Sequence, residues 1–172
     1  MTKQILTIIL LACTLFVNAQ NKEAESTVVK LGQQAPNFSF KDESGKIVSL
    51  TDYKGKLVMI TFFATWCPPC RQELPVIQQE IYDKYKDNSN FQLLIFGREH
   101  SNAEVQSFKK VQHFTMPFFA DKKRSVYSLF AQNYIPRNFL IDATGKIIYM
   151  EVGYSAEKFE EMQKIISEEL KK

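Results

Sequence analysis

Between Leu57 and Arg71 the sequence reads LVMITFFATWCPPCR, an apolar run followed by two cysteines three positions apart. The run from Leu57 to Ala64 follows Gly55 and is nearly all apolar, which is typical of a strand buried on both faces in a parallel sheet. A helical period comes next, with Leu74, Ile77, Ile81 and Tyr85 on one face and a kink predicted at Pro75. The two cysteines therefore lie where a strand ends and a helix begins.

That junction gives Cys67 and Cys70 different chemistry. Free N–H groups and the helix dipole favour negative charge on the first cysteine, which lowers the thiol pKa expected for Cys67. Pro68 suits the first turn, where its missing N–H costs nothing. We expect Cys67 to be the exposed nucleophile and Cys70, one turn later, to be the buried thiol that resolves a mixed disulfide. Zinc would need two further ligands, and the only histidines, His100 and His113, have the wrong spacing for a finger. No metal is therefore expected.

The N-terminus is typical of an exported protein. Residues 5–17 are apolar apart from two threonines, follow Lys3 and end at Val17-Asn18-Ala19, so residues 1–19 are predicted to be a signal peptide. Leu10-Leu11-Ala12-Cys13 also resembles a lipoprotein cleavage box, which would leave Cys13 as a lipid anchor. Cleavage after Ala19 leaves only Cys67 and Cys70. A pair this close in sequence constrains the unfolded chain little, so we assign it a chemical role instead of a structural one.

Composition and charge narrow the choice of class. A chain of 172 residues with 45% hydrophobic and 24% charged residues is typical of one globular domain. The net charge of +3 and a longest basic run of three residues, Lys122 to Arg124, do not imply nucleic-acid binding. Residues 20–35 are mostly polar and are expected to be a flexible lead-in, followed by a domain over residues 36–172.

Further elements follow from turn and periodicity signals. Hairpins are predicted at residues 37–50 and 138–152, and a second buried strand at Phe91 to Phe96. A capping box at Ser101 opens a helix whose expected inner face is Val105, Phe108 and Val111. A short helix near residue 129 and a last helix over residues 159–170 complete the chain. Alternating strands and helices followed by a hairpin predict an α/β sandwich with a mixed sheet.

The segment from Ala64 to Arg71 resembles the active site of the thioredoxin superfamily, and Ile135-Pro136 resembles its cis-proline segment. The entry Ala35-Pro36-Asn37-Phe38 with its hairpin narrows the resemblance to the TlpA/ResA-like extracytoplasmic thiol-disulfide oxidoreductases, over roughly residues 32–170. This resemblance implies a three-layer sandwich with helices on both faces of a mixed sheet and an N-terminal hairpin. It also implies a cis bond before Pro136 and substrate contacts by Trp66, Ile135 and Pro136.

Two positions depart from the family pattern. Thr61 stands where thioredoxin has a buried acid, and Arg137 follows the proline where the family commonly has a small or hydroxylated residue. Glu99 is the candidate replacement acid, because it follows the second strand at the same sheet edge as Cys67. The alternative is that Glu99 only solvates a loop or pairs with Arg98 or His100.

The leading functional hypothesis is an envelope enzyme that reduces disulfides in exported proteins through Cys67 and Cys70. Its expected partners are protein disulfides and a membrane thiol-disulfide electron donor, with no cofactor, and the chain is expected to be a monomer. A thiol peroxidase is one alternative, but the Pro-x-x-x-Thr that precedes a peroxidatic cysteine is missing before Cys67. A redox-inactive binding module is the other, although such domains usually lose one of the two cysteines.

Overall fold

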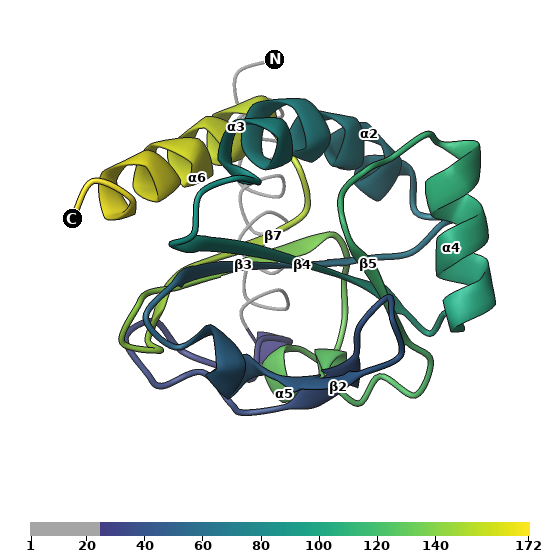
Figure 1. Ribbon diagram of the computed structural model, residues 1–172, viewed down its shortest axis with the longest axis horizontal. Helices are drawn as coiled ribbons and strands as arrows, with labels where there is room; N and C mark the ends of the chain where they lie inside the picture. The colour runs from purple at the N-terminus through teal and green to yellow at the C-terminus, as the bar shows by residue number, and fades with distance from the viewer. Residues whose placement is uncertain (1–24) are drawn as a thin grey trace, which may run out of the picture.

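The computed structural model describes residues 25–172, which form three layers (Figure 1). The middle layer is a five-stranded sheet with the order β5-β4-β3-β6-β7. Its strands are β3 (Leu57–Phe63), β4 (Phe91–Arg98), β5 (Phe118–Asp121), β6 (Arg137–Ile141) and β7 (Ile147–Val152). β3, β4 and β5 run parallel, whereas β6 is antiparallel to both β3 and β7. The mixed sheet and the three layers confirm the predicted fold class.

The two outer layers differ in kind (Figure 1). One face of the sheet is covered by α2 (Pro68–Ile77), the π-helical turn η2 (Gln78–Tyr82), α3 (Asp83–Tyr85) and α6 (Ala156–Glu169). The other face is covered by the hairpin of β1 (Ser39–Lys41) and β2 (Ile47–Ser49), the 3-10 turn η1 (Leu50–Tyr53) and α5 (Tyr127–Phe130). The remaining helix, α4 (Asn102–Val111), lies at the β5 edge. Both predicted hairpins are present.

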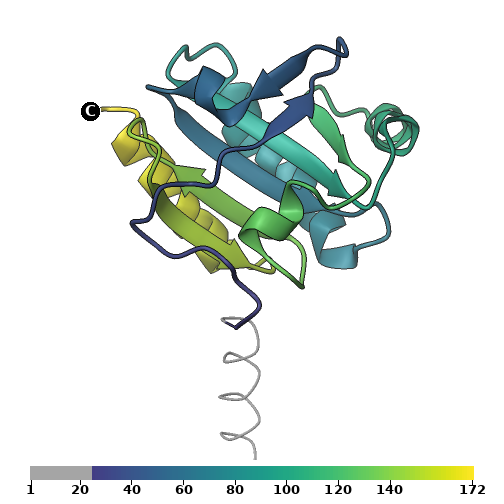
Figure 2. The same cartoon turned by 90° about the horizontal axis from the view of Figure 1, so that it is seen from below.

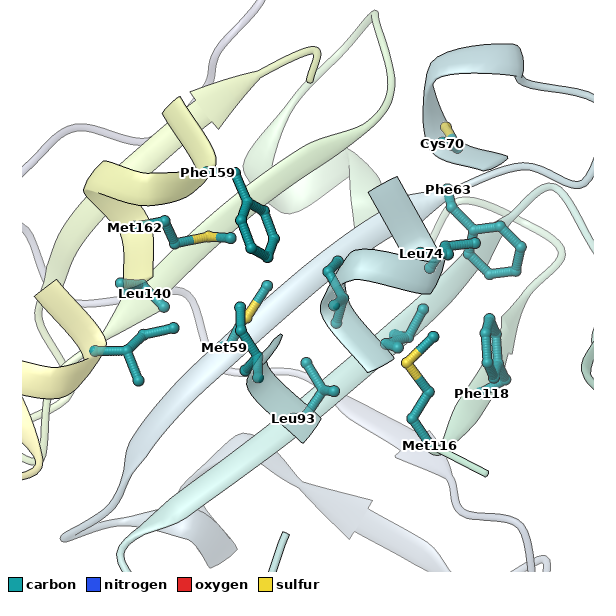
Figure 3. Close-up of a cluster of buried hydrophobic side chains, with 14 of the residues drawn as sticks. Met59, Phe63, Cys70, Leu74, Leu93, Met116, Phe118, Leu140, Phe159 and Met162 are labelled. Carbon is teal, nitrogen blue, oxygen red and sulfur yellow. The ribbon is translucent and has the colours of Figure 1, made fainter. Parts of the chain in front are cut away.

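Each face of the sheet has its own core, because side chains of β3 alternate between them. Met59 and Phe63 join the cluster under α2 and α6, which also contains Cys70 (Figure 3). Ile60 and Phe62 join an aromatic cluster on the opposite face. All seven β3 side chains are buried, as expected for a central strand. Helix α2, which begins at the cysteine pair, is thus held on the sheet by the first of these cores.

The chain after β4 differs from the sequence prediction in two ways. Strand β5, which pairs with β4 at Ile95↔Phe118 and the residues that follow, is absent from the elements that the sequence predicts. Val111 is predicted on the inner face of α4, but it is 65% exposed. Only Val105 of the three predicted inner residues is fully buried, since α4 lies at the sheet edge and not over its centre.

The described part of the lead-in, residues 25–35, packs against the domain (Figure 2). Val29 is buried, and Thr27 and Gln34 form isolated β-bridges with Ala131 and Lys146. The buried Arg137 donates hydrogen bonds to Thr27 Oγ1 at 2.8 Å and to Ser26 Oγ.

The predicted signal peptide and Cys13 lie outside the described residues. Among residues 25–172, no helix has the length and apolar character that a membrane span requires.

Candidate active site

The two active-site cysteines begin helix α2 and are joined by a disulfide. Cys67 is the N-cap, and its Sγ accepts a hydrogen bond from the backbone N–H of Cys70 at 3.3 Å. Pro68 occupies the first helical position, as the sequence predicts. Cys70 is fully buried, but Cys67 is only 3% exposed, so in the disulfide form the expected exposed nucleophile is also largely covered.

The cis peptide bond predicted between Ile135 and Pro136 is present. It lies next to the disulfide, because Cys67 Sγ is 3.7 Å from the carbonyl oxygen of Ile135. Pro136 is buried and Ile135 is half-buried, whereas Trp66 is 62% exposed beside the cysteines. The fold therefore brings the cysteines together with all three residues that the resemblance assigned to substrate contact.

Arg137 does not project into this site. Its guanidinium is buried and donates from Nε to the carbonyl oxygen of Asn133 at 2.9 Å, in addition to its bonds to the lead-in. The departure from the family pattern at this position therefore affects how the lead-in is held, and the buried Arg137 side chain adds no charge to the surface beside Cys67.

The contacts of Glu99 favour the alternative interpretation. The Glu99 carboxylate pairs with Arg98 at 3.0 Å and Arg124 at 3.8 Å, and its side chain is 46% exposed. Its neighbour His100 is the residue that faces the active-site loop, where Nε2 accepts a hydrogen bond from the N–H of Thr65 at 2.9 Å. Glu99 is an exposed ion-pair partner, as the alternative interpretation held.

The buried acid is Glu73 of α2, three residues after Cys70 and only 2% exposed. Asn138 donates from Nδ2 to Glu73 Oε1 at 2.6 Å, and Thr61 donates to Asn138 Oδ1 at 2.8 Å. Burial raises the pKa of Glu73 to about 8, the Asn138 hydrogen bond opposes this increase, and the charge of Glu151 adds to it. Thr61, in the position of the missing acid, thus reaches a carboxyl group through one asparagine.

Glu73 is not among the residues predicted from the sequence, although a signal was present. Residues three apart on a helix have Cβ atoms roughly 5–6 Å apart, so Glu73 shares a face with Cys70. Leu74 and Ile77 mark that same face as the buried one. A carboxylate at this position has to be neutralised or hydrogen-bonded, which makes it a candidate functional group.

Metal chemistry has no donor set in the part of the chain that the structure describes. No group of three His, Cys, Asp or Glu residues is close enough there to hold an ion. The one buried histidine of residues 25–172, His100, already accepts a backbone hydrogen bond through Nε2.

Comparison with known proteins places this site in a family. The family model described as Redoxin matches residues 30–166. A thiol-disulfide oxidoreductase ResA of Bacillus cereus is 32% identical over 149 residues, covering 87% of this chain and 85% of the relative. The thioredoxin-like protein YneN of Bacillus subtilis is 35% identical over 155 residues, covering 90% of each chain.

Solved structures of similar proteins support the same family. A Bacteroides thetaiotaomicron protein described as a candidate disulfide isomerase superposes with a TM-score of 0.81 at 36% identity, covering 86% of this chain and 94% of that one. A thiol:disulfide interchange protein of Chlorobium tepidum gives 0.68 at 26% identity, covering 83% and 99%. The cysteine pair at the start of α2, the adjacent cis-proline and these relatives together show that the chain belongs to the Redoxin family, as a TlpA/ResA-like thiol-disulfide oxidoreductase of the thioredoxin superfamily.

Proposed function

We propose that this protein is an extracytoplasmic reductant that converts disulfides of exported proteins to dithiols. The observation that carries the proposal is the position of Cys67 at the N-cap of α2, where the N–H of Cys70 donates to its sulfur. In the reduced protein the same N–H and the helix dipole stabilise a Cys67 thiolate. A thiolate at this position can attack a substrate disulfide presented beside Trp66 and the cis-proline loop.

The exchange takes place in two steps that balance. The Cys67 thiolate attacks one sulfur of the substrate disulfide, which forms a mixed disulfide and releases the first substrate thiolate. Cys70 then loses its proton and attacks Cys67 Sγ. This attack forms the Cys67–Cys70 disulfide and releases the second substrate thiolate. The substrate gains two electrons, and the protein ends in the disulfide form seen here.

Glu73 is proposed as the group that takes the proton from Cys70. It lies one helical turn from Cys70 on the same buried face. Its pKa of about 8 is close to the roughly 8.5 of an ordinary thiol, so a proton can pass between the two groups without a large energy difference. An ordinary exposed glutamate would be too weak a base for this step.

The reducing direction is supported by the short segment between β4 and the cis-proline. Strong envelope oxidants of this fold resemble thioredoxin with a large helical domain inserted, whereas the described segment here contains only α4, β5 and α5. Equilibration with glutathione tests the direction. We expect a potential nearer the roughly −270 mV of thioredoxin than the roughly −120 mV of a strong oxidant. A potential above about −150 mV would reverse the assignment.

The roles of the cysteines are tested by trapping. Cys70→Ser should accumulate mixed disulfides with exported proteins at Cys67, because the resolving thiol is missing. Cys67→Ser is the matched control and should trap little. Limiting alkylation of the reduced protein should label Cys67 first, and faster labelling of Cys70 would contradict the assignment.

Export and supply of electrons complete the proposal. The apolar stretch of residues 5–17 after Lys3 supports export, and a membrane thiol-disulfide relay is the proposed electron donor. The N-terminal residue of the protein recovered from the envelope distinguishes the two forms. Gln20 indicates cleavage after Ala19, whereas a lipid-modified Cys13 indicates anchoring. An uncleaved chain found only in the cytoplasm would refute export.

A further inference from the structure

Glu73 has one oxygen that the active site does not use. Oε1 accepts from Asn138, but Oε2 is buried and has no hydrogen-bond partner among residues 25–172. Glu73 lines a cavity of about 10 Å³, which is room for about one water molecule. The cavity lies between α2, β7 and the start of α6, with walls that include Tyr149, Glu151, Tyr154 and Lys158.

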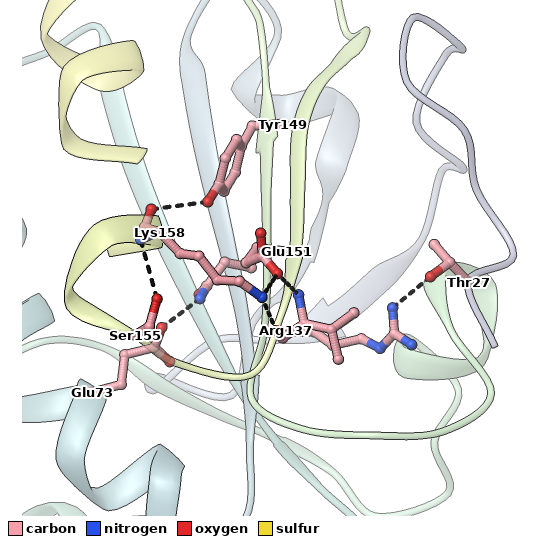
Figure 4. Close-up of polar contacts among 9 residues, drawn as sticks. Thr27, Glu73, Arg137, Tyr149, Glu151, Ser155 and Lys158 are labelled. Atoms are coloured by element: carbon pink, nitrogen blue, oxygen red, sulfur yellow. Dashed lines mark hydrogen bonds and ion pairs between the residues drawn. The ribbon is translucent and has the colours of Figure 1, made fainter. Parts of the chain in front are cut away.

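Two of the residues that line this cavity, Glu151 and Lys158, form an ion pair (Figure 4). Lys158 Nζ of α6 is 2.6 Å from Glu151 Oε1 of β7 and also donates to the carbonyl oxygen of Val152 at 3.1 Å. The Lys158 side chain is 43% exposed, so the pair connects the cavity with solvent. Tyr149 fixes the two elements together by donating to the carbonyl oxygen of Lys158 at 3.0 Å.

The other sides of Glu73 are closed. Thr61 and Asn138 are buried in neighbouring strands. Thr61 donates a hydrogen bond to Asn138, and Asn138 donates one to Glu73. Cys70 is fully buried on the same helix. A proton that Glu73 takes from Cys70 can therefore leave through the cavity between β7 and α6.

We propose that Glu73 releases this proton to solvent through one water in the cavity, and that Glu151 and Lys158 are positioning residues that control the release. The inference rests on the proposed role of Glu73 in disulfide exchange. In the first step Cys70 passes its proton to the Glu73 carboxylate and becomes a thiolate. In the second, the neutral Glu73 passes the proton through the water to solvent beside the ion pair and returns to its charged form.

Glu151 and Lys158 affect the pKa of Glu73 in opposite directions. The negative charge of Glu151 disfavours ionisation of Glu73 and raises its pKa. Lys158 neutralises Glu151 at 2.6 Å and so limits this effect. The other titratable groups that line the cavity are Tyr149 and Tyr154. The ion pair thus keeps Glu73 a base that can both accept and release the proton.

The test follows the Glu73 titration in the oxidised protein by its infrared carboxyl band, assigned by loss of the band in Glu73→Gln. Glu151→Gln should lower the midpoint by roughly 1 unit, the low end of the range for a neighbouring charge. Lys158→Met should raise it, Lys158→Arg should restore it, and the double variant should return toward the original value. The pH profile of model-disulfide reduction should move in the same directions.

Glu80 and Lys84 provide a matched control, because they form an exposed ion pair further along the same helical segment. Glu80→Gln and Lys84→Met should leave the midpoint unchanged. Shifts of Glu151→Gln and Lys158→Met in the same direction, or no shift in either, would overturn the inference. A high-resolution crystal structure should show a water bonded to Glu73 Oε2, and a dry cavity would also overturn it.

The failure of this inference differs from failure of the proposed function. If Glu73→Gln changes the pH profile but the variants of the pair do not, only the control by Glu151 and Lys158 is refuted. If Glu73→Gln leaves the profile unchanged, Glu73 is not the proton acceptor, and both ideas are refuted.

Discussion

Replacing Glu73 with Gln should stabilise the oxidised protein at high pH. The pKa of Glu73 rises from 4.5 to about 8 on folding, and burial is the main cause. A carboxyl group whose folded pKa is raised costs nothing below pH 4.5, and its cost grows as the pH rises through the folded value. At 1.36 kcal/mol per unit, the full cost above pH 8 is about 5 kcal/mol, and the cost at pH 7 is about 3 kcal/mol.

Gln is close in shape to a protonated Glu and keeps an acceptor oxygen for Asn138. The variant should therefore match the original protein near pH 4.5 and exceed it increasingly up to pH 9. Urea unfolding of the disulfide form at several pH values measures this difference without interference from titrating thiols. Glu80→Gln is the control, because Glu80 is an exposed residue on the same helical segment. Stability curves that stay parallel from pH 5 to pH 9 would refute the assignment of a buried Glu73 with a raised pKa.

Three further substitutions test the packing described above. Gly97→Ala places a Cβ 2.4 Å from Val105 Cγ1 and should cost about 1–3 kcal/mol in urea unfolding, partly recovered by adding Val105→Ala. Arg137→Met should cost about 1–3 kcal/mol and speed amide exchange of residues 26–29, because it removes the side-chain bonds to the lead-in. Val111→Lys should change stability by less than about 0.5 kcal/mol, since that side chain is exposed. A larger loss of stability would show that Val111 packs in the core as the sequence predicts.

The active-site junction could be predicted because its signals are local. A continuous apolar run specifies the buried strand β3, and Pro68 in the first turn marks the start of α2. The prediction of a cis bond before Pro136 rests on the family resemblance, since no local pattern distinguishes a cis from a trans bond there. Strand β5 is only four residues long and is fixed by pairing with β4, a contact that local periodicity does not report.

The sequence points to Glu99 instead of the buried Glu73 for a related reason. Parallel strands do bring the end of β4 to the active-site edge, but Glu99 has a φ of 65°, a left-handed conformation in which the chain turns. The turn leaves Glu99 beside Arg98 and Arg124 and directs His100 to Thr65. Glu73 is desolvated in part by residues of β7 and α6, about 80 positions later in the chain. Its burial is a property of the assembled fold and cannot be seen in a short window of sequence.

The packed lead-in determines which backbone groups at the edge of the sheet are open to pairing with other chains. β7 is the last strand of the sheet, and an open strand edge invites pairing with any extended chain. The N–H of Gly32 donates to the carbonyl oxygen of Ile147 at 2.8 Å, and the N–H of Ile147 donates to the carbonyl oxygen of Gln33 at 2.9 Å. These two bonds cover the first part of that edge. By covering this part of the edge, the lead-in leaves fewer backbone groups of β7 open to pairing with extended chains. It thereby lowers the risk of aggregation along β7.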